Sequence, residues 1–136
     1  MFAAGALGAC QPSVNARLAQ KVGFIESSTV SFLVGTVALL LLALIFGRGS
    51  FRALPAASWW ELTGGLIGAF YVYIALLFVP RLGTAAAMAV TIAGQLLMAL
   101  LLDQFRVFGL RGIPLDISRV AGTILMLLGT WLIIRV

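Results

Sequence analysis

The feature that most constrains this chain is a set of three long stretches without a charged side chain, at residues 27–47, 62–80 and 82–102. An α-helix needs about 20 predominantly apolar residues to cross the hydrocarbon core of a bilayer. Each stretch is therefore long enough to form one membrane-spanning helix. The composition agrees, because 62% of the residues are hydrophobic and 10% are charged, whereas soluble domains are about 45–50% apolar and about 25% charged.

Two further stretches complete the predicted fold. The last has Arg119 in its first turn and Arg135 at its end, where both long side chains can reach the lipid headgroups. The first is the weakest, because it carries polar side chains and is interrupted by Pro12. The chain is predicted to be all-α, a single transmembrane domain over residues 1–136 with no room for a soluble domain. We expect its five helices at residues 1–20, 28–47, 60–80, 83–103 and 117–135.

The inventory of reactive side chains excludes most catalytic and metal chemistry. The chain has no His, four acidic residues and one Cys, Cys10. One Cys cannot form a disulfide within the chain, and structural zinc sites need Cys and His ligands. The nine basic residues are scattered between the apolar stretches instead of forming a patch for nucleic acid. We therefore expect no enzymatic activity, no metal, no cofactor and no nucleic-acid partner.

Polar side chains near the middle of the predicted spans are the strongest indication of function. On the first helix Gln11 lies near the midplane, and Asn15 follows four residues later on the same face. Pro12 lacks a backbone N–H, which leaves the carbonyl of Gly8 without its helical partner. The other central polar residues are Tyr71 and Tyr73, on roughly opposite faces of the third helix, and Thr91 with Gln95 on the fourth.

Two interpretations account for these polar groups. An unpaired amide in hydrocarbon costs several kcal/mol, so the groups must face one another, water or a ligand. They are either interhelical glue, with hydrogen bonds that contribute about 0.6–2 kcal/mol each, or a polar cavity of the kind that transporters place beside interrupted helices. We favour the cavity, because glue needs fewer groups and no helix break. The substrate-binding candidates are Gln11, Asn15, Tyr71, Thr91 and Gln95.

Two carboxylates lie at predicted helix ends. Glu61 begins the third helix, where a carboxylate favours the helix dipole, and Asp103 ends the fourth. Both are candidates for proton coupling. Because neither lies at mid-depth, we expect both to be interfacial structural charges, with Asp103 near Arg106.

Small residues predict where the spans can approach one another closely, because lipid provides no hydrophobic drive for helix packing. We expect a helix contact at Gly64 and Gly68 in particular. The spaced pairs are Gly64 with Gly68, Ala85 with Ala89, and Gly122 with Gly129.

Four segments carry a resemblance to a known family. They are GACQPSVNARL at 8–18, SFLVGT at 31–36, VPRLG at 79–83, and AGQ at 93–95 with Asp103. Together they resemble the YdcZ-like family, a short five-helix branch of the drug/metabolite transporter superfamily of the bacterial inner membrane. The most specific elements are Gln-Pro-x-Val-Asn and Gly-Gln-x(7)-Asp, and the resemblance covers nearly the whole chain.

The resemblance implies a half-size transporter whose antiparallel dimer supplies the ten helices of the full-length relatives. The first helix begins very near its motif, as a trimmed or misassigned start would produce. Small multidrug exporters are more loosely similar, because they rely on a first-helix glutamate where this chain offers only Gln11 and Asn15. Export of cationic drugs by that route is therefore not expected.

The predicted function is secondary transport of a small polar or amphipathic metabolite by the rocking of two inverted halves about a central site. The expected partners are the lipid bilayer, a second copy in antiparallel orientation and a small-molecule substrate. The alternative is a non-transporting membrane scaffold or assembly subunit whose amides hold helices together. A passive pore is a third class, and its flux would not saturate.

The distribution of basic residues predicts that the chain inserts in both orientations. Orientation follows the excess of Lys and Arg in short loops. With five spans, the side of the N-terminus carries five basic residues and the other side four, which is almost no bias. The first group is Arg48, Arg52, Arg106, Arg111 and Arg119, and the second is Arg17, Lys21, Arg81 and Arg135.

Overall fold

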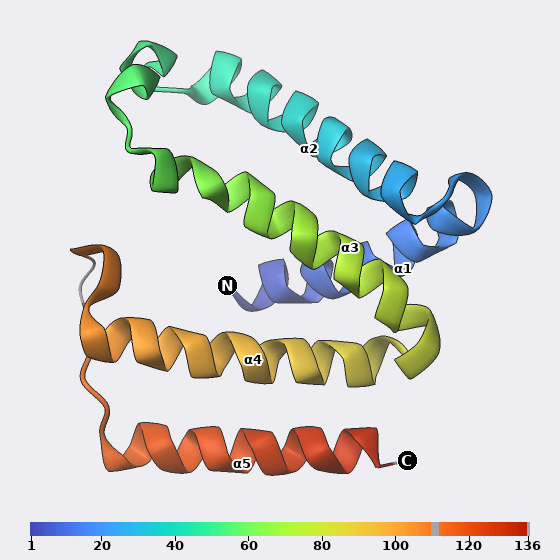
Figure 1. The fold of residues 1–136 in the computed structure, drawn as a ribbon, viewed down its shortest axis with the longest axis vertical. Helices are drawn as coiled ribbons and strands as arrows, with labels where there is room; N and C mark the ends of the chain where they lie inside the picture. The colour runs from blue at the N-terminus through green and yellow to red at the C-terminus, as the bar shows by residue number, and fades with distance from the viewer. Residues whose placement is uncertain (110–111, 136) are drawn as a thin grey trace. The chain divides into compact units, whose positions relative to one another are not determined.

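The computed structural model describes residues 1–109 and 112–135. Within these ranges the chain is helical and has no strand, which confirms the predicted all-α class (Figure 1). The long helices are α1 (Phe2–Val22), α2 (Phe24–Phe46), α3 (Gly64–Leu82), α4 (Thr84–Phe105) and α5 (Ile117–Ile134). Short 3-10 helices lie between them: η1 (Phe51–Ala56), η2 (Trp59–Thr63) and η3 (Val107–Gly109).

Among the described residues, four segments are long and apolar enough to cross a membrane: Phe24–Phe46, Trp59–Leu82, Thr84–Phe105 and Ile117–Ile134. They correspond to the last four predicted spans. The helix α1 has 21 residues and continues through Pro12, but the polar residues around Pro12 make it less apolar than the others. A fifth span at α1 stays a prediction.

Two glycines with positive φ join consecutive helices directly. Gly23, with φ +102, is the only residue between α1 and α2, and Gly83, with φ +80, is the only residue between α3 and α4. Glycine is the residue that adopts this conformation without strain. The predicted bounds leave residues 21–27 outside both helices, because the charges of Lys21 and Glu26 are typical of a loop. In the structure Lys21 lies in the last turn of α1 and Glu26 lies in the first turn of α2. The helix dipole stabilises each charge at that position.

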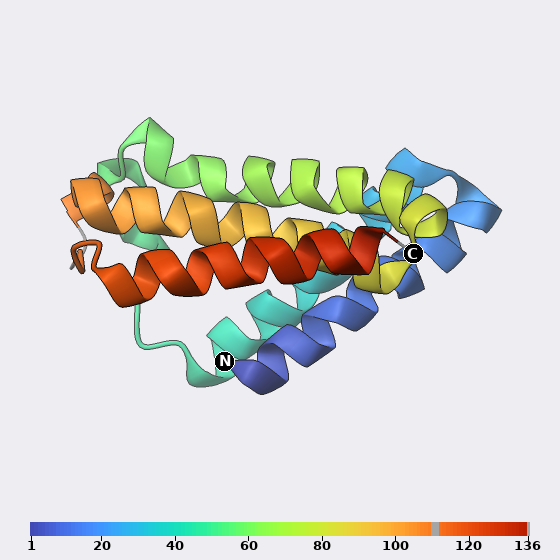
Figure 2. The ribbon, with the colours of Figure 1, turned by 90° about the horizontal axis from the view of Figure 1, so that it is seen from below.

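The chain forms two compact units, Met1–Arg81 and Leu82–Val136. In the Met1–Arg81 unit, α1 and α2 pack against each other beyond the turn at Gly23 (Figure 2). The buried core of this unit, which we call the α1–α3 core, consists of Ala16, Ala19, Val72 and Leu76, with Phe32 and Tyr71 packed against it. Most other large apolar side chains are exposed, as expected for helices whose outer faces contact lipid.

We predicted a helix contact at Gly64 and Gly68 of α3, and the structure shows this contact at Gly68. A Cβ atom on Gly68 would lie 3.2 Å from Cζ of Phe32 on α2. A Cβ atom on Gly64 would have no neighbour within 4 Å. Gly68 therefore allows the ring of Phe32 to approach α3.

In the Leu82–Val136 unit, α4 and α5 lie side by side and antiparallel (Figures 1 and 2). The small residues Ala85, Ala89 and Gly129 line a shallow groove of about 350 Å³ on this pair. The hydroxyl of Thr130 donates a hydrogen bond to the carbonyl of Ala89 at 3.4 Å. Gly122, by contrast, faces open space.

Candidate functional site

Three of the five predicted substrate-binding residues come together between α1 and α3. Gln11 and Asn15 of α1 line a crevice with Tyr71 of α3. Pro12 is buried at this level, inside an otherwise continuous helix. The crevice is too narrow to hold a water molecule. The α1–α3 contact is therefore closed at its polar level in this conformation.

Asn15 forms two hydrogen bonds with α2. Its side chain is buried, and Nδ2 donates to Oγ of Ser31 at 3.0 Å. The backbone carbonyl of Asn15 accepts a hydrogen bond from Oγ of Ser27 at 2.8 Å. Ser27 is 0% exposed. We call Asn15, Ser27 and Ser31 the α1–α2 clamp, and it gives Asn15 the role of interhelical glue.

The two serines of the clamp are missing from the predicted site. Ser27, Ser28 and Ser31 form a cluster at the start of α2. Their spacing places Ser27 and Ser31 on one face, four residues apart. That spacing was the signal that could have identified them, but it does not say which neighbouring helix the face meets.

Gln11 and Tyr71 differ from Asn15, because neither side chain has a hydrogen-bond partner within the described parts of the chain. Gln11 is exposed and Tyr71 is partly buried. An amide offers two donors and an acceptor, and a phenol offers one donor and an acceptor. Within the described residues, Gln11 and Tyr71 therefore keep unused hydrogen-bonding groups at the crevice.

Thr91 and Gln95 belong to the Leu82–Val136 unit. They lie one turn apart on α4, and the structure shows Gln95 exposed and Thr91 partly exposed. Within residues 1–109 and 112–135 neither side chain has a hydrogen-bond partner. Their place on a common face of α4 follows from the i, i+4 spacing. A common site with Gln11, Asn15 and Tyr71 stays a prediction.

Both coupling candidates make structural contacts. The Glu61 carboxylate accepts a hydrogen bond from the backbone N–H of Ser58 at 2.6 Å and so caps η2, ahead of α3. The carboxylate of Asp103 pairs with Arg119 of α5 at 3.1 Å. Arg106 lies near Asp103, as the sequence predicted, and its backbone N–H donates to the backbone carbonyl of Asp103 at 3.3 Å. Arg106 ends α4 in a left-handed conformation with φ +50, whereas Arg119 enters the first turn of α5 beside the end of α4. The ion pair of Asp103 is thus made by a residue of the next helix, 16 positions away in the sequence.

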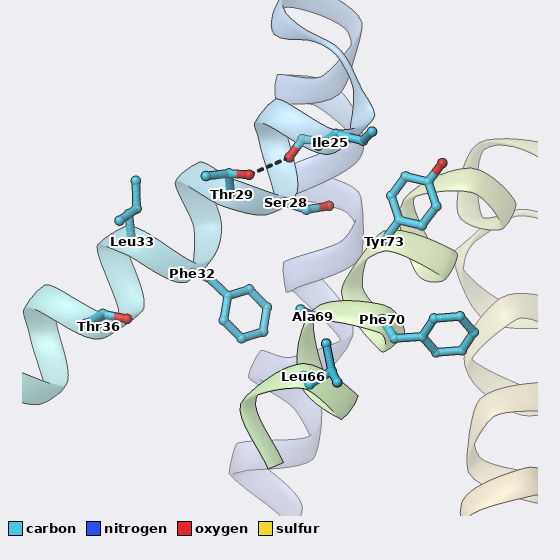
Figure 3. A pocket seen from close by; sticks show the side chains of 10 residues that line it. All are labelled: Ile25, Ser28, Thr29, Phe32, Leu33, Thr36, Leu66, Ala69, Phe70 and Tyr73. Atoms are coloured by element: carbon cyan, nitrogen blue, oxygen red, sulfur yellow. Dashed lines mark hydrogen bonds between the residues drawn. The ribbon is translucent and has the colours of Figure 1, made fainter. Parts of the chain in front are cut away.

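A larger opening lies between α2 and α3 of the Met1–Arg81 unit. This α2–α3 groove has a volume of about 710 Å³. Figure 3 shows the ring of Phe32 projecting from α2 toward α3 across it. Its lining residues are Ile25, Ser28, Thr29, Phe32, Leu33, Thr36, Leu66, Ala69, Phe70 and Tyr73.

Comparison with known proteins identifies the family of the chain. Residues 1–132 match the model of the family described as "Putative inner membrane exporter, YdcZ". The chain belongs to this family. A relative, Inner membrane protein YdcZ of Escherichia coli (strain K12), is 38% identical over 79 residues, which cover 57% of this chain and 51% of that protein. The chain thus spans about half the length of the curated relative that it matches.

These matches confirm the resemblance that the sequence motifs carry, and they place this YdcZ family member in the bacterial inner membrane. The apolar helices α2 to α5 agree with that location. No solved structure matches the chain.

Proposed function

We propose that this YdcZ family member is a secondary transporter of a small polar or amphipathic metabolite, working by alternating access as a dual-topology homodimer. The family description as an inner membrane exporter supports the transport class. The observation that carries the proposal is the crevice beside Pro12, where Gln11 and Tyr71 keep unpartnered hydrogen-bonding groups between apolar helices.

The energetics of these groups favour a site over simple packing. An amide that faces hydrocarbon without a partner costs several kcal/mol. Asn15 avoids that cost through the α1–α2 clamp. Gln11 has no such hydrogen bonds within the described residues. Its amide is therefore satisfied only when substrate, water or another protein surface meets it.

The closed crevice supports alternating access. Because the crevice is too narrow for water, a substrate enters the space between Gln11 and Tyr71 only when α1 and α3 separate at this level, although Gln11 itself is exposed at the edge of the crevice. Rigid-body rocking of one repeat against another opens such sites in transporters. The clamp would keep α1 with α2 during this movement, so that the two helices move as one body relative to α3.

A second copy completes the arrangement. One copy has a small buried core and leaves the polar side chains of Gln11 and Gln95 exposed. Two oppositely inserted copies related by a two-fold axis in the membrane plane would cover these amides and reproduce the inverted repeat of larger transporters. The homodimer then has ten helices.

The test is stabilisation of the purified protein by ligands. A ligand that binds only the folded state must raise its thermal stability. We expect a member of a panel of small polar and amphipathic metabolites to raise the Tm, Gln11→Leu to remove that shift, and Gln20→Leu to retain it. Gln20 is the matched control, because it is also exposed on α1 but lies outside the crevice. Loss of the shift in both variants, or its survival in Gln11→Leu, contradicts the proposed site.

The scaffold remains the second candidate, because the hydrogen bonds of Asn15 are of the glue type. A scaffold gives no Tm shift with any metabolite and no substrate-dependent flux in proteoliposomes. A transporter gives flux that saturates with substrate concentration, and a passive pore gives flux that does not.

A further inference from the structure

We propose that the α2–α3 groove binds a neutral amphipathic molecule that has an aromatic or branched apolar body and at least one hydrogen-bond donor. The groove is a second binding site in addition to the crevice, and the proposal rests on the proposed function only where it treats the bound molecule as a transported substrate. The crevice at Gln11 and the groove are separate places on the Met1–Arg81 unit, and they share no lining residue.

The groove has the size and lining of a small-molecule site. Its volume of about 710 Å³ lies within the usual range of about 300–1,000 Å³ for ligand pockets. The rings of Phe32, Phe70 and Tyr73 belong to its lining (Figure 3). Such pockets combine an apolar lining with a few placed polar groups.

Two of the four hydroxyl residues that line the groove favour a ligand that donates hydrogen bonds. The hydroxyls of Ser28 and Thr29 donate to the carbonyls of Phe24 and Ile25, each at 2.9 Å (Figure 3 shows the bond of Thr29). Their hydrogens are therefore used within α2, and their oxygen lone pairs are left as acceptors. A lipid acyl chain has no donor to offer these oxygens. A small amphipathic molecule with a hydroxyl or amine group does.

The charge of the lining selects for a neutral ligand. Every residue that lines the groove is uncharged. An ion would leave water without meeting a counter-charge, which is strongly unfavourable in an apolar environment. For a neutral molecule the free-energy cost is the desolvation of its polar group, and a hydrogen bond to Ser28 or Thr29 offsets that cost.

The position of the groove connects it to the crevice. Phe32, which lines the groove, and Tyr71, which lines the crevice, both pack against the α1–α3 core. The groove and the crevice therefore border on the same core. A ligand that enters the groove from the bilayer lies next to the helix pair that must separate for transport.

Gly68 provides a specific way to test the groove. A Cβ atom at this position would lie 3.2 Å from Cζ of Phe32, so Gly68→Ala forces the ring, which lines the groove, to shift by a few tenths of an ångström. Gly65→Ala is the matched control, because a Cβ atom on Gly65 has no neighbour within 4 Å. Both changes add one methyl group to α3.

The experiment is photolabelling of the full chain in lipid nanodiscs. The probe is a neutral benzyl alcohol that carries a trifluoromethyl-diazirine, and the control probe is the same aryl diazirine with a methyl group in place of the hydroxymethyl group. We expect the alcohol to label residues 25–36 and 66–73 above the level of the control probe, and excess unlabelled benzyl alcohol to compete. Gly68→Ala should lower the competable labelling about tenfold, and Gly65→Ala should leave it unchanged.

Three results would overturn the proposal. Equal labelling by both probes without competition means that the groove is only a lipid-facing surface. Absence of labelling by either probe means that a second copy covers it. Identical labelling of the Gly68→Ala and Gly65→Ala proteins means that the ligand does not occupy the space beside Phe32. Failure of the proposed function is a separate outcome: the groove then labels as expected, while no metabolite gives saturable flux and Gln11→Leu changes nothing.

Discussion

At the scale of single residues, the two neighbouring amides of α1 are predicted to act differently. We expect Asn15→Leu to lower the free energy of unfolding by about 1–3 kcal/mol, because it leaves the clamp hydroxyl of Ser31 without its donor. Gln11→Leu should change stability by less than about 0.5 kcal/mol while it abolishes ligand binding. Thermal unfolding of the two variants in the same detergent measures both effects.

A double-mutant cycle of Asn15→Leu with Ser31→Ala isolates the clamp hydrogen bond. We expect a coupling energy of about 0.6–2 kcal/mol, the range for hydrogen bonds between membrane helices. Additive effects of the two substitutions would show that the contact contributes nothing to stability.

The sequence predicted the depth of these residues but not their partners. Depth follows from counting along an apolar span, so Gln11, Asn15 and Tyr71 could be assigned to one level. The partner depends on which face of a helix meets its neighbour. In α2 the residues from Val37 to Phe46 are apolar on every face, because lipid and packed protein both favour apolar side chains. The pairing of Asn15 with Ser31 was therefore not available from periodicity.

At the scale of elements, the single-glycine turn at Gly83 is predicted to be essential for stability. Its φ of +80 with an extended ψ of 155 belongs to a region that is populated almost only by glycine. Gly83→Ala should lower the free energy of unfolding by about 1–3 kcal/mol, although no atom lies within 4 Å of the new Cβ. Gly122→Ala on α5 is the control, and it should be neutral or stabilising, because alanine is the better helix former.

The link between α4 and α5 gives a second prediction at this scale. The Asp103–Arg119 pair is 38% and 28% exposed at its two side chains, so we expect Asp103→Asn to cost only about 0.2–1 kcal/mol. Arg119 retains its hydrogen bond to the carbonyl of Ile113 in this variant. Because Asp103 acts as a structural charge, the pH dependence of substrate uptake should not change. A shifted pH profile with normal expression would instead make Asp103 a coupling group.

At the scale of the whole molecule, the fold class could be predicted because it depends on composition and span length alone. The boundary between α1 and α2 could not be predicted. Charged residues such as Lys21 and Glu26 are as typical of loops as of the helix ends where the structure places them. The α2–α3 groove was also absent from the sequence prediction. Its hydroxyl residues are dispersed among apolar neighbours. Only the fold, which brings the ring of Phe32 on α2 to Gly68 on α3, places Ser28 and Tyr73 around one space.

Orientation in the membrane is also a property of the whole molecule. With five spans, five basic residues would lie on one side and four on the other. Of these, Arg111 lies outside the described residues. The pairing of Arg119 with Asp103 does not alter the count, because acidic residues contribute little to the orientation rule. A chain with so small a bias should insert both ways, and an antiparallel homodimer requires copies of both orientations.

Reporters at the C-terminus test this dual insertion. One reporter is a phosphatase that is active only outside the inner membrane, and the other is a fluorescent protein that fluoresces only inside it. We expect comparable signals from both fusions of the unmodified chain. Gly49→Arg adds a basic residue to the side of the N-terminus and should drive the C-terminus outward, because loops rich in Lys and Arg stay in the cytoplasm. Replacing Arg48 and Arg52 with Gln should drive the C-terminus inward. A single fixed location that neither change moves would rule out the dual-topology homodimer and require a partner of different sequence.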